Sequence, residues 1–466
     1  MGAVSPDASE AALERLRADG AAPATIASFQ RAVGLLASGD RGLIAETEIE
    51  PVETVQDYES LMPAGERERE LLDRTVVIKL NGGLGTSMGM SGPKSLLEVK
   101  DGLSFLEIAA RQVLALRAAN GDPRLPLVLL DSFRTAEPSV GLLEALGGLS
   151  AGLPPDFLQG RVPKLLDDGS LMPALWPADP ELEWSPPGHG DLYPALVGSG
   201  LLARLREEGF RYAFVSNADN LGAVVDTSIL AWLATNGIPF AMEVARRTEA
   251  DRKGGHIAGL PGGGLVLREI AQTPDGDLEA FGDIERHRFF NTNSIWFDLD
   301  ALAQVLGNDG VIELPLIVNR KTVDPSDPSS PAVVQLETAV GAALSAIPGA
   351  RALLVPRSRF MPVKTTDDLL VLRSDAYRLE ADFRMAFDGD PSVGPPVVGL
   401  DPEYFRLIDD FQARFPDGAP SLVECRRLSV HGDVLFEGGV EVVGEVAVGA
   451  EPGDRLVVGA GTRLAG

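Results

Sequence analysis

The stretch VVIKLNGGLGTSMGMSGPKSLLEV, Val76 to Val99, decides how this chain is interpreted. Val76 to Leu80 has the apolar composition of a buried strand. A loop follows with glycines at 82, 83, 85, 89 and 92, and then Lys94. Loop glycines let backbone N–H groups approach a ligand without Cβ clashes, and a concavity lined by such groups binds anions. The stretch therefore predicts a loop that binds a nucleotide phosphate, with the lysine adding a positive charge.

The loop matches neither of the two common phosphate-binding fingerprints. The pattern G-x-x-x-x-G-K-[ST] needs a glycine where this chain has Pro93 before Lys94. The pattern G-x-G-x-x-G fits Gly83 and Gly85, but Gly89 comes one residue late. The loop therefore supports neither a P-loop ATPase nor a dehydrogenase.

The composition describes a large, acidic, globular chain. Its 466 residues are 45% hydrophobic, enough for two to three domains, and a net charge of −27 would repel nucleic acid and anionic membranes. No stretch approaches the roughly 20 apolar residues of a membrane span, and residues 1–20 do not resemble a secretory signal. Cys425 is the single cysteine, which fits a reducing compartment. We therefore expect a cytoplasmic protein with no nucleic-acid or membrane partner.

Lysine is scarce, because only seven of the 41 basic residues are lysine. A lysine kept in such a chain is expected to serve as a compact ammonium, which the guanidinium of arginine cannot imitate. Lys94 and Lys364 are lysines of this kind that also lie in candidate ligand-binding segments.

The residue pattern divides the chain into four parts. Residues 1–72 predict an N-terminal helical segment, since apolar residues recur at helical spacing in Ala11–Arg17 and Pro23–Leu36. Residues 73–375 alternate apolar runs with helical segments, which is typical of an α/β fold with a mostly parallel sheet. Residues 376–427 form a linker to residues 428–466. There, valines recur between glycines, which predicts a small β-solenoid or an all-β cap, and the open edge of a solenoid could join copies of the chain.

The strands expected in the α/β part are short apolar runs bounded by turn residues. They are Val76–Leu80, Leu127–Leu130, Tyr212–Ser216, Phe240–Val244, Leu265–Ile270, Ser294–Phe297 and Ala352–Val355.

Two segments follow the carboxyl ends of expected strands, where ligands of such sheets bind. One is the glycine loop, and the other is Asn217-Ala218-Asp219. A carboxylate beside a phosphate loop is a usual means of holding Mg²⁺ with few protein ligands. Asp219 is therefore the predicted magnesium ligand.

A histidine flanked by glycines marks another candidate segment. His189 lies between Gly188 and Gly190, so we expect it to face a ligand. We expect Asp191, the next residue but one, to cap the following turn.

Two later segments add polar and positive groups. Asn291 and Asn293 alternate along an expected strand, and their amides suit the hydroxyls of a sugar. Arg357, Arg359 and Lys364 place three positive charges within eight residues and predict a local anion site. No nucleophile–base pair is visible, which favours direct phosphoryl-type transfer by positioning and charge neutralisation.

The order of the motifs resembles a known family. KLNGGLGTSMG, GPKS, PPGHGD, SNADNLGA, KGG, FNTN, QLETAVGAA, VPRSRF and PVKTTDDLL follow one another between about residues 75 and 375. This series is similar to the eukaryotic-type UTP–glucose-1-phosphate uridylyltransferases, or UDP-glucose pyrophosphorylases. The resemblance implies a Rossmann-like nucleotidyltransferase fold of the glycosyltransferase-A-like kind, with a mixed sheet flanked by helices and a C-terminal left-handed β-helix.

The resemblance also implies roles for single residues. Gln159 and Gly188 match positions that read uracil, and Asp131 stands where the family commonly has asparagine. The implied catalytic residues are Lys364, Lys94 and Asp219, the last as magnesium ligand. The implied nucleotide-binding residues are Leu80, Asn81, Gly82, Gly83, Lys94, Gln159, Gly188 and Lys364. The implied sugar-phosphate-binding residues are Gly82, Gly83, His189, Asn217, Ala218, Asp219, Asn291 and Asn293.

The implied reaction is Mg²⁺-dependent attack of glucose 1-phosphate on the α-phosphorus of UTP, giving UDP-glucose and pyrophosphate. Two alternatives stay open: a broad-specificity UDP-sugar pyrophosphorylase, and a catalytically inactive regulator that binds nucleotide sugars. Broad-specificity UDP-sugar and UDP-N-acetylhexosamine pyrophosphorylases carry an arginine in the loop, whereas this chain has Thr86-Ser87. A regulator would have no need of a metal ligand, so the presence of Asp219 argues against it.

Overall fold

The computed structural model describes residues 6–307 and 309–466, which are built around one large mixed sheet. Its neighbouring strands run in the order β1 (Gln56–Asp57), β17 (Arg351–Leu354), β11 (Phe240–Arg246), β14 (Phe289–Asp298), β10 (Tyr212–Asn217), β2 (Thr75–Leu80), β5 (Leu127–Asp131) and β6 (Asp156–Leu158). Two more strands, β12 (His256–Gly259) and β13 (Leu265–Arg268), join beside β14.

The strands expected from the sequence are confirmed, and two of them, β13 and β14, bring antiparallel pairs into a sheet expected to be mostly parallel. β10, β2, β5 and β6 are parallel, as are β11, β17 and β1. β14 runs antiparallel to both β10 and β11 and so divides these two parallel groups. The sheet is therefore mixed, and the shorter expected strand Ser294–Phe297 is the last part of β14.

Both faces of the sheet are buried under helices, which is why its strands are apolar on both sides. Val76 and Ile78 of β2 pack toward α6 (Leu192–Gly198), α7 (Leu201–Glu207), α10 (Leu299–Leu306) and α11 (Ala343–Ala346). Val77 packs on the other face toward α3 (Glu68–Asp73), α4 (Phe105–Ala119), α5 (Ala136–Leu146) and α8 (Thr227–Asn236). Ser104 and Glu107 form a capping box that starts α4.

The N-terminal part contains α1 (Pro6–Ala18) and α2 (Pro23–Ala37), as expected. These helices share a core with a small sheet of β15 (Ile317–Thr322), β16 (Ala332–Glu337) and β8 (Leu165–Leu166), and with β7 (Val162–Pro163). The chain then reaches β1, which pairs with β17 at the edge of the main sheet. The N-terminal part is thus joined to the α/β body by packing and by strand pairing.

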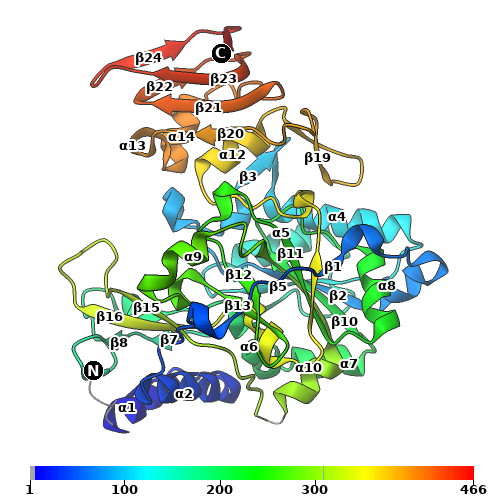
Figure 1. Cartoon of the computed structure of the whole chain (residues 1–466), viewed down its shortest axis with the longest axis vertical. Helices are drawn as coiled ribbons and strands as arrows, with labels where there is room; N and C mark the ends of the chain where they lie inside the picture. Colours follow the sequence, from blue (N-terminus) through cyan, green and yellow to red (C-terminus); the bar gives the residue numbers. More distant parts are fainter. Residues whose placement is uncertain (1–5, 308) are drawn as a thin grey trace.

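The C-terminal strands β20 to β25, which we call the C-terminal coils, lie at the opposite end of the molecule from α1 and α2 (Figure 1). All their strand pairs are parallel, in the order β20 (Val397–Gly399), β21 (Cys425–His431), β23 (Glu441–Gly449) and β25 (Arg463–Ala465), with β22 (Asp433–Phe436) paired to β24 (Arg455–Val458). The C-terminal strands therefore pair in parallel, as a solenoid requires. β20 and the start of β21 lie before residue 428, and the expected domain boundaries remain predictions.

Between the body and the coils lie further short elements: α12 (Thr366–Arg373), the hairpin β18 (Tyr377–Leu379) and β19 (Met385–Phe387), α13 (Pro402–Phe405) and α14 (Ile408–Arg414). They share one apolar cluster with the coils and with Met88 and Leu97 of the glycine-loop region. The described elements also include β3 (Glu98–Lys100), β4 (Leu103–Ser104), β9 (Trp184–Ser185) and α9 (Leu278–Gly282). Across residues 6–307 and 309–466, no helix has the length and apolar character needed to cross a membrane.

Candidate active site

A cavity of about 310 Å³ opens at the carboxyl ends of β2 and β10. The parallel register pairs Leu80 with Asn217, so the glycine loop and the Asp219 segment leave the sheet side by side. The cavity is lined by Leu80, Asn81, Gly82, Gly83, Lys94, Ser95, Leu130, Gln159, Pro186, Gly188, His189, Asn217, Ala218 and Asp219. Every residue that the family resemblance assigns to the site, except Asn291, Asn293 and Lys364, is in this lining.

The glycine loop is folded tightly against its neighbours. Gly85 and Gly89 have φ values of 63° and 75°, a backbone region that glycine adopts without strain. A Cβ at Gly82 would lie 2.7 Å from the side-chain amide of Gln159. Glycine at position 82 therefore lets Gln159 lie against the loop at the edge of the cavity.

The side chain of Asn81 anchors the start of the glycine loop through buried hydrogen bonds. Asn81 is 2% exposed, and its Nδ2 donates to Asp131 Oδ1 at 2.7 Å and to Ser139 Oγ at 2.8 Å. Asp131 also accepts from Thr135 Oγ1 at 2.8 Å, and burial raises its pKa to about 6. The Nδ2 group of Asn81 is thus engaged in this buried network, and its backbone N–H donates to the carbonyl oxygen of Leu130 at 2.8 Å.

Lys94 links the predicted catalytic segments. Its Nζ donates to Asp219 Oδ2 at 2.6 Å and also to the carbonyl oxygen of Val363. The glycine-loop lysine, the carboxylate after β10 and the segment before α12 therefore meet at one ammonium group. Lys364 directly follows Val363.

Asp219 is the protein's candidate donor for Mg²⁺. No group of three or more His, Cys, Asp or Glu side chains that could hold a metal occurs among residues 6–307 and 309–466. A single carboxylate facing a phosphate-binding cavity still fits Mg²⁺, which commonly takes one or two carboxylates and fills its other positions with phosphate oxygens and water. The donor set is therefore compatible with the predicted metal.

His189 is held as a neutral ring with one defined donor. The backbone N–H of Val340 donates to its Nδ1 at 2.9 Å, so the proton of the neutral ring is on Nε2. Desolvation by the surrounding protein lowers the pKa of His189 to about 4, although the residue keeps solvent access at the cavity. His189 can therefore donate a hydrogen bond in the cavity but cannot act as a cationic acid near neutral pH.

The two predicted sugar-binding asparagines lie directly behind the cavity lining. Asn293 Nδ2 donates to Asn217 Oδ1 at 3.0 Å, and the Asn293 backbone N–H donates to Asn291 Oδ1 at 2.8 Å. The register of β14 with β11 shifts between Met242 and Val244, and Asn293 has a φ of 61°. Asn293 thus turns toward Asn217 through a bulge in β14.

Sequence and structure comparisons agree with this geometry. Residues 27–442 match the profile of the family described as UTP–glucose-1-phosphate uridylyltransferase. The chain belongs to the UTP–glucose-1-phosphate uridylyltransferase family. The Solanum tuberosum protein of that name is 39% identical, with 94% of this chain and 91% of the relative covered. Enzyme 2 of that name from Dictyostelium discoideum is 38% identical over 89% of this chain and 81% of the relative.

Solved structures of UDP-glucose pyrophosphorylases have the same fold. A mutant of the Leishmania major enzyme in complex with UDP-glucose has a TM-score of 0.91 and 42% identity, covering 99% of this chain and 98% of that one. The Trypanosoma brucei structure, titled UDP-glucose phosphorylase, has a TM-score of 0.90 and 41% identity, covering 98% of both chains. The expectation of family membership is confirmed, while the roles of single residues remain predictions.

Lys364 is placed at the rim of this family member's cavity. It is exposed and does not contribute to the lining, although its neighbour Val363 contacts Lys94. Its positive charge opposes the effect of burial, which raises the pKa of Glu269. Lys364 and Glu269 therefore interact electrostatically at the side of the site where the asparagines lie.

Glu269 is a site candidate that the sequence reasoning missed. A Cβ at Gly255 would lie 2.5 Å from the Glu269 carboxylate, and the Gly255 carbonyl oxygen accepts from the backbone N–H of Asn291. Glu269 is thus beside the asparagines in space. The sequence offered no local signal for it, because a single glutamate after an apolar strand has no distinctive spacing.

The predicted anion site around the arginines is wrong. Arg357 forms an ion pair with Asp251 at 2.7 Å, and Arg359 forms one with the fully buried Glu243 at 2.6 Å. The two guanidinium groups therefore neutralise acidic residues of this family member instead of a ligand. The pattern of three charges was real, but the sequence could not show the carboxylates that fold against it.

The expected capping role of Asp191 is also wrong. Its side chain makes no hydrogen bond to the start of α6. Instead, Asp191 Oδ2 accepts from the backbone N–H of Gly160 at 2.5 Å. The carboxylate thus connects the His189 turn with the loop that carries Gln159.

Proposed function

We propose that this protein transfers the uridylyl group of UTP to glucose 1-phosphate, forming UDP-glucose and pyrophosphate. The observation that carries the proposal is that Lys94, Asp219 and His189 line the same cavity as the glycine loop. Family membership supports the same reaction, because the relatives at 38–39% identity have this activity as their name.

In the proposed reaction, a phosphate oxygen of glucose 1-phosphate forms a bond to the α-phosphorus of UTP as the bond to pyrophosphate breaks. The attacking oxygen is already anionic, so no general base is required. Lys94 offsets negative charge on the phosphates, and the glycine loop permits close approach of its backbone. His189 contributes a neutral N–H donor.

We also propose Mg²⁺ as the cofactor, with Asp219 as its protein ligand. The ion would neutralise phosphate charge when bound. Lys94 Nζ lies 2.6 Å from the Asp219 carboxylate. This contact keeps the carboxylate oriented toward the cavity with its charge balanced.

We assign the uracil base of UTP to one end of the cavity and the glucosyl group to the other. Gln159 and Gly188 are proposed to contact uracil, since both line the cavity on the side of the His189 turn. Asn217, Asn293 and Glu269 are proposed to contact the glucosyl hydroxyls. Lys364, at the rim, is proposed to approach the phosphates when the ligands bind.

Three further properties are proposals of the same kind. The C-terminal coils are proposed to wind as a left-handed β-helix, supported by successive strand pairs that are all parallel. Their open end is proposed to join copies of the chain into a homo-oligomer. The single cysteine supports a cytoplasmic location.

Pyrophosphate release from UTP, measured with a panel of sugar 1-phosphates, tests the proposed function. We expect glucose 1-phosphate to give the highest kcat/KM. Comparable rates with galactose 1-phosphate would instead support the broad-specificity alternative. UDP-glucose binding without pyrophosphate release under saturating Mg²⁺ would support the inactive regulator.

A further inference from the structure

A buried carboxylate lies behind the part of the cavity assigned to uracil. Asp191 is 3% exposed, and Gly160 is the residue directly after Gln159. The hydrogen bond from the Gly160 N–H to Asp191 Oδ2 measures 2.5 Å. Gly160 belongs to the loop between β6 and β7, whereas Asp191 belongs to the His189 turn.

The loop that carries Gln159 is held at three points. The backbone N–H of Gln159 donates to the carbonyl oxygen of Asp131 at 2.8 Å, at the end of β5. The Gln159 side chain lies against Gly82, where a Cβ would lie 2.7 Å from its amide and displace it. Asp191 then holds the next amide along the chain, so Gln159 lies between two fixed backbone positions.

Helix α2 packs against the loop that carries Gln159 and Gly160. A Cβ on Gly160 would lie 2.9 Å from Thr25 Cγ2 and 3.3 Å from Asp191 Oδ2. Thr25 is 5% exposed and lies in the first turn of α2. The loop is thus confined between the N-terminal helix and the Asp191 carboxylate, with no room for a side chain at position 160.

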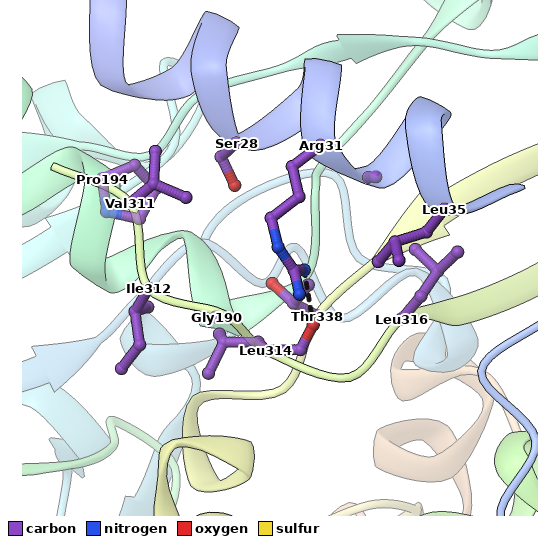
Figure 2. A pocket seen from close by; sticks show the side chains of 11 residues that line it. Ser28, Arg31, Leu35, Gly190, Pro194, Val311, Ile312, Leu314, Leu316 and Thr338 are labelled. Atoms are coloured by element: carbon purple, nitrogen blue, oxygen red, sulfur yellow. Dashed lines mark hydrogen bonds between the residues drawn. The ribbon is translucent and has the colours of Figure 1, made fainter. Parts of the chain in front are cut away.

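The same helix also packs behind the His189 turn. Figure 2 shows a small cavity between α2 and this turn, lined by Ser28, Arg31 and Gly190 among others. Arg31 Nη1 donates to the Leu314 carbonyl oxygen at 3.0 Å across it. A second cavity of about 20 Å³ lies between Thr25 and Asp191. Helix α2 therefore lies behind both segments assigned to uracil, the loop that carries Gln159 and the His189 turn.

We infer that Asp191, supported by Thr25 of α2, is a positioning residue that sets Gln159 for recognition of the uracil base. This inference rests on the proposed function, because it assumes that the base of UTP lies at Gln159. It gives the N-terminal helices a role in substrate selection without any contact between them and the nucleotide.

The environment of the carboxyl supports a specific role. Burial raises the pKa of Asp191 to about 7, and the Gly160 hydrogen bond only partly offsets this effect. A carboxyl kept in an unfavourable environment costs stability, and such groups cluster at functional sites. Replacing it by an apolar group of similar shape would also leave the Gly160 amide without its acceptor.

The first test compares Asp191→Leu with Asp191→Asn. Leucine has a similar shape but cannot accept the hydrogen bond, whereas asparagine can. We expect Asp191→Leu to raise the KM for UTP about tenfold and to reduce the preference for UTP over CTP. The kcat and the KM for glucose 1-phosphate should change little, and Asp191→Asn should restore the wild-type values within a few fold.

A matched control separates positioning from stability. Asp298 is also a buried aspartate, 8% exposed, but it caps α10 and pairs with Arg211 at 2.6 Å, outside the cavity lining. Asp298→Leu should lower the thermal midpoint without changing the KM for UTP. A change in the KM for UTP after Asp298→Leu that equals the Asp191→Leu effect would show that general destabilisation explains both.

A second pair of variants tests the role of α2 and stays informative if Asp191→Leu does not fold. Gly160→Ala should displace the loop and raise the KM for UTP, because its Cβ would meet Thr25 Cγ2. Thr25→Ser removes that methyl group, so the double variant should recover much of the UTP affinity. The inference is overturned if neither Asp191→Leu nor Gly160→Ala alters the KM for UTP while the wild type is fully active. An inactive wild type would instead refute the proposed function.

Discussion

At the scale of single residues, Asp219 and Lys364 are assigned different places. Asp219 lines the cavity, whereas Lys364 is exposed at its rim. Loss of one electrostatic contact to the reacting phosphates costs roughly 3 kcal/mol, or about a hundredfold in rate. We expect Asp219→Ala and Lys364→Ala each to lower kcat by that amount, measured as pyrophosphate release at saturating Mg²⁺.

The two variants should differ in their metal dependence. Asp219→Ala should raise the Mg²⁺ concentration needed for half-maximal activity, because the ion would lose its protein ligand. Lys364→Ala should leave that concentration near its wild-type value. Near-normal turnover of either variant would remove that residue from the proposed mechanism.

His189 makes a prediction about stability rather than activity. Its pKa is lowered to about 4 by desolvation, against about 6.5 in an unfolded chain. Between these values the unfolded chain binds the proton more strongly, so the native state loses stability as pH falls from about 7 toward 4. Urea unfolding at pH 7 and pH 5 should show a larger loss in the wild type than in His189→Gln, and the difference should be small because solvent reaches the exposed residue and screens the effect. Equal losses in the two proteins would mean that the His189 ring is not kept neutral by desolvation.

At the scale of elements, the bulge in β14 combines backbone shape with ligand chemistry. Asn293 adopts a φ of 61°, which costs a residue such as alanine about 1 kcal/mol or more relative to glycine. Asn293→Gly keeps this backbone but loses the amide that contacts Asn217. We expect Asn293→Gly to raise the KM for glucose 1-phosphate with little loss of stability. Asn293→Ala should raise the same KM and also lower the free energy of unfolding by about 1 kcal/mol.

The variants Asn293→Gly and Asn293→Ala test separately whether the backbone at position 293 is strained and whether the Asn293 amide binds the sugar. If both variants unfold like the wild type, the left-handed backbone carries no strain. If both keep the wild-type KM for glucose 1-phosphate, the Asn293 amide has no part in binding the sugar.

The elements also show what the sequence could and could not predict. The apolar runs located β2, β5 and β10 because buried strands are recognisable from local composition. The direction of β14 was missed, since no local pattern states which neighbours a strand pairs with. The carboxylates facing Arg357 and Arg359, and the Gly160 partner of Asp191, are far apart in the chain. Such tertiary contacts decide whether a charge faces a ligand or another side chain.

At the scale of the whole molecule, the glycine loop is connected to the C-terminal coils. Met88 and Leu97 share an apolar cluster with Leu428 and Phe436. A Cβ at Gly89 would lie 3.0 Å from Leu407 Cδ2, so the outer end of the loop packs on the segment before α14. A change in the position of the coils would therefore reach the phosphate-binding loop through direct packing.

The open end of these coils carries the last prediction, which concerns assembly. Among the described strands, β24 pairs only with β22, and β25 pairs only with β23, so the final coil has a free side. Val457 on β24 is 49% exposed there. A charge on an exposed strand edge opposes edge-to-edge association. If copies of the chain meet at this coil, Val457→Glu should shift the sedimentation mass from a multiple of 49.3 kDa toward 49.3 kDa.

The control is Met62→Glu, which places the same charge on an exposed apolar residue outside the coils, where the side chain is 78% exposed. It should leave the mass unchanged, because only the coil end is expected to form the contact. A monomeric wild type, or dissociation by Met62→Glu and not by Val457→Glu, would contradict assembly through the coils. The coils share a core with the glycine loop, so assembly could alter the active site. Comparing the KM for UTP of Val457→Glu with that of the wild type tests this effect. An unchanged KM in a fully dissociated variant would show that each chain carries a complete and independent site.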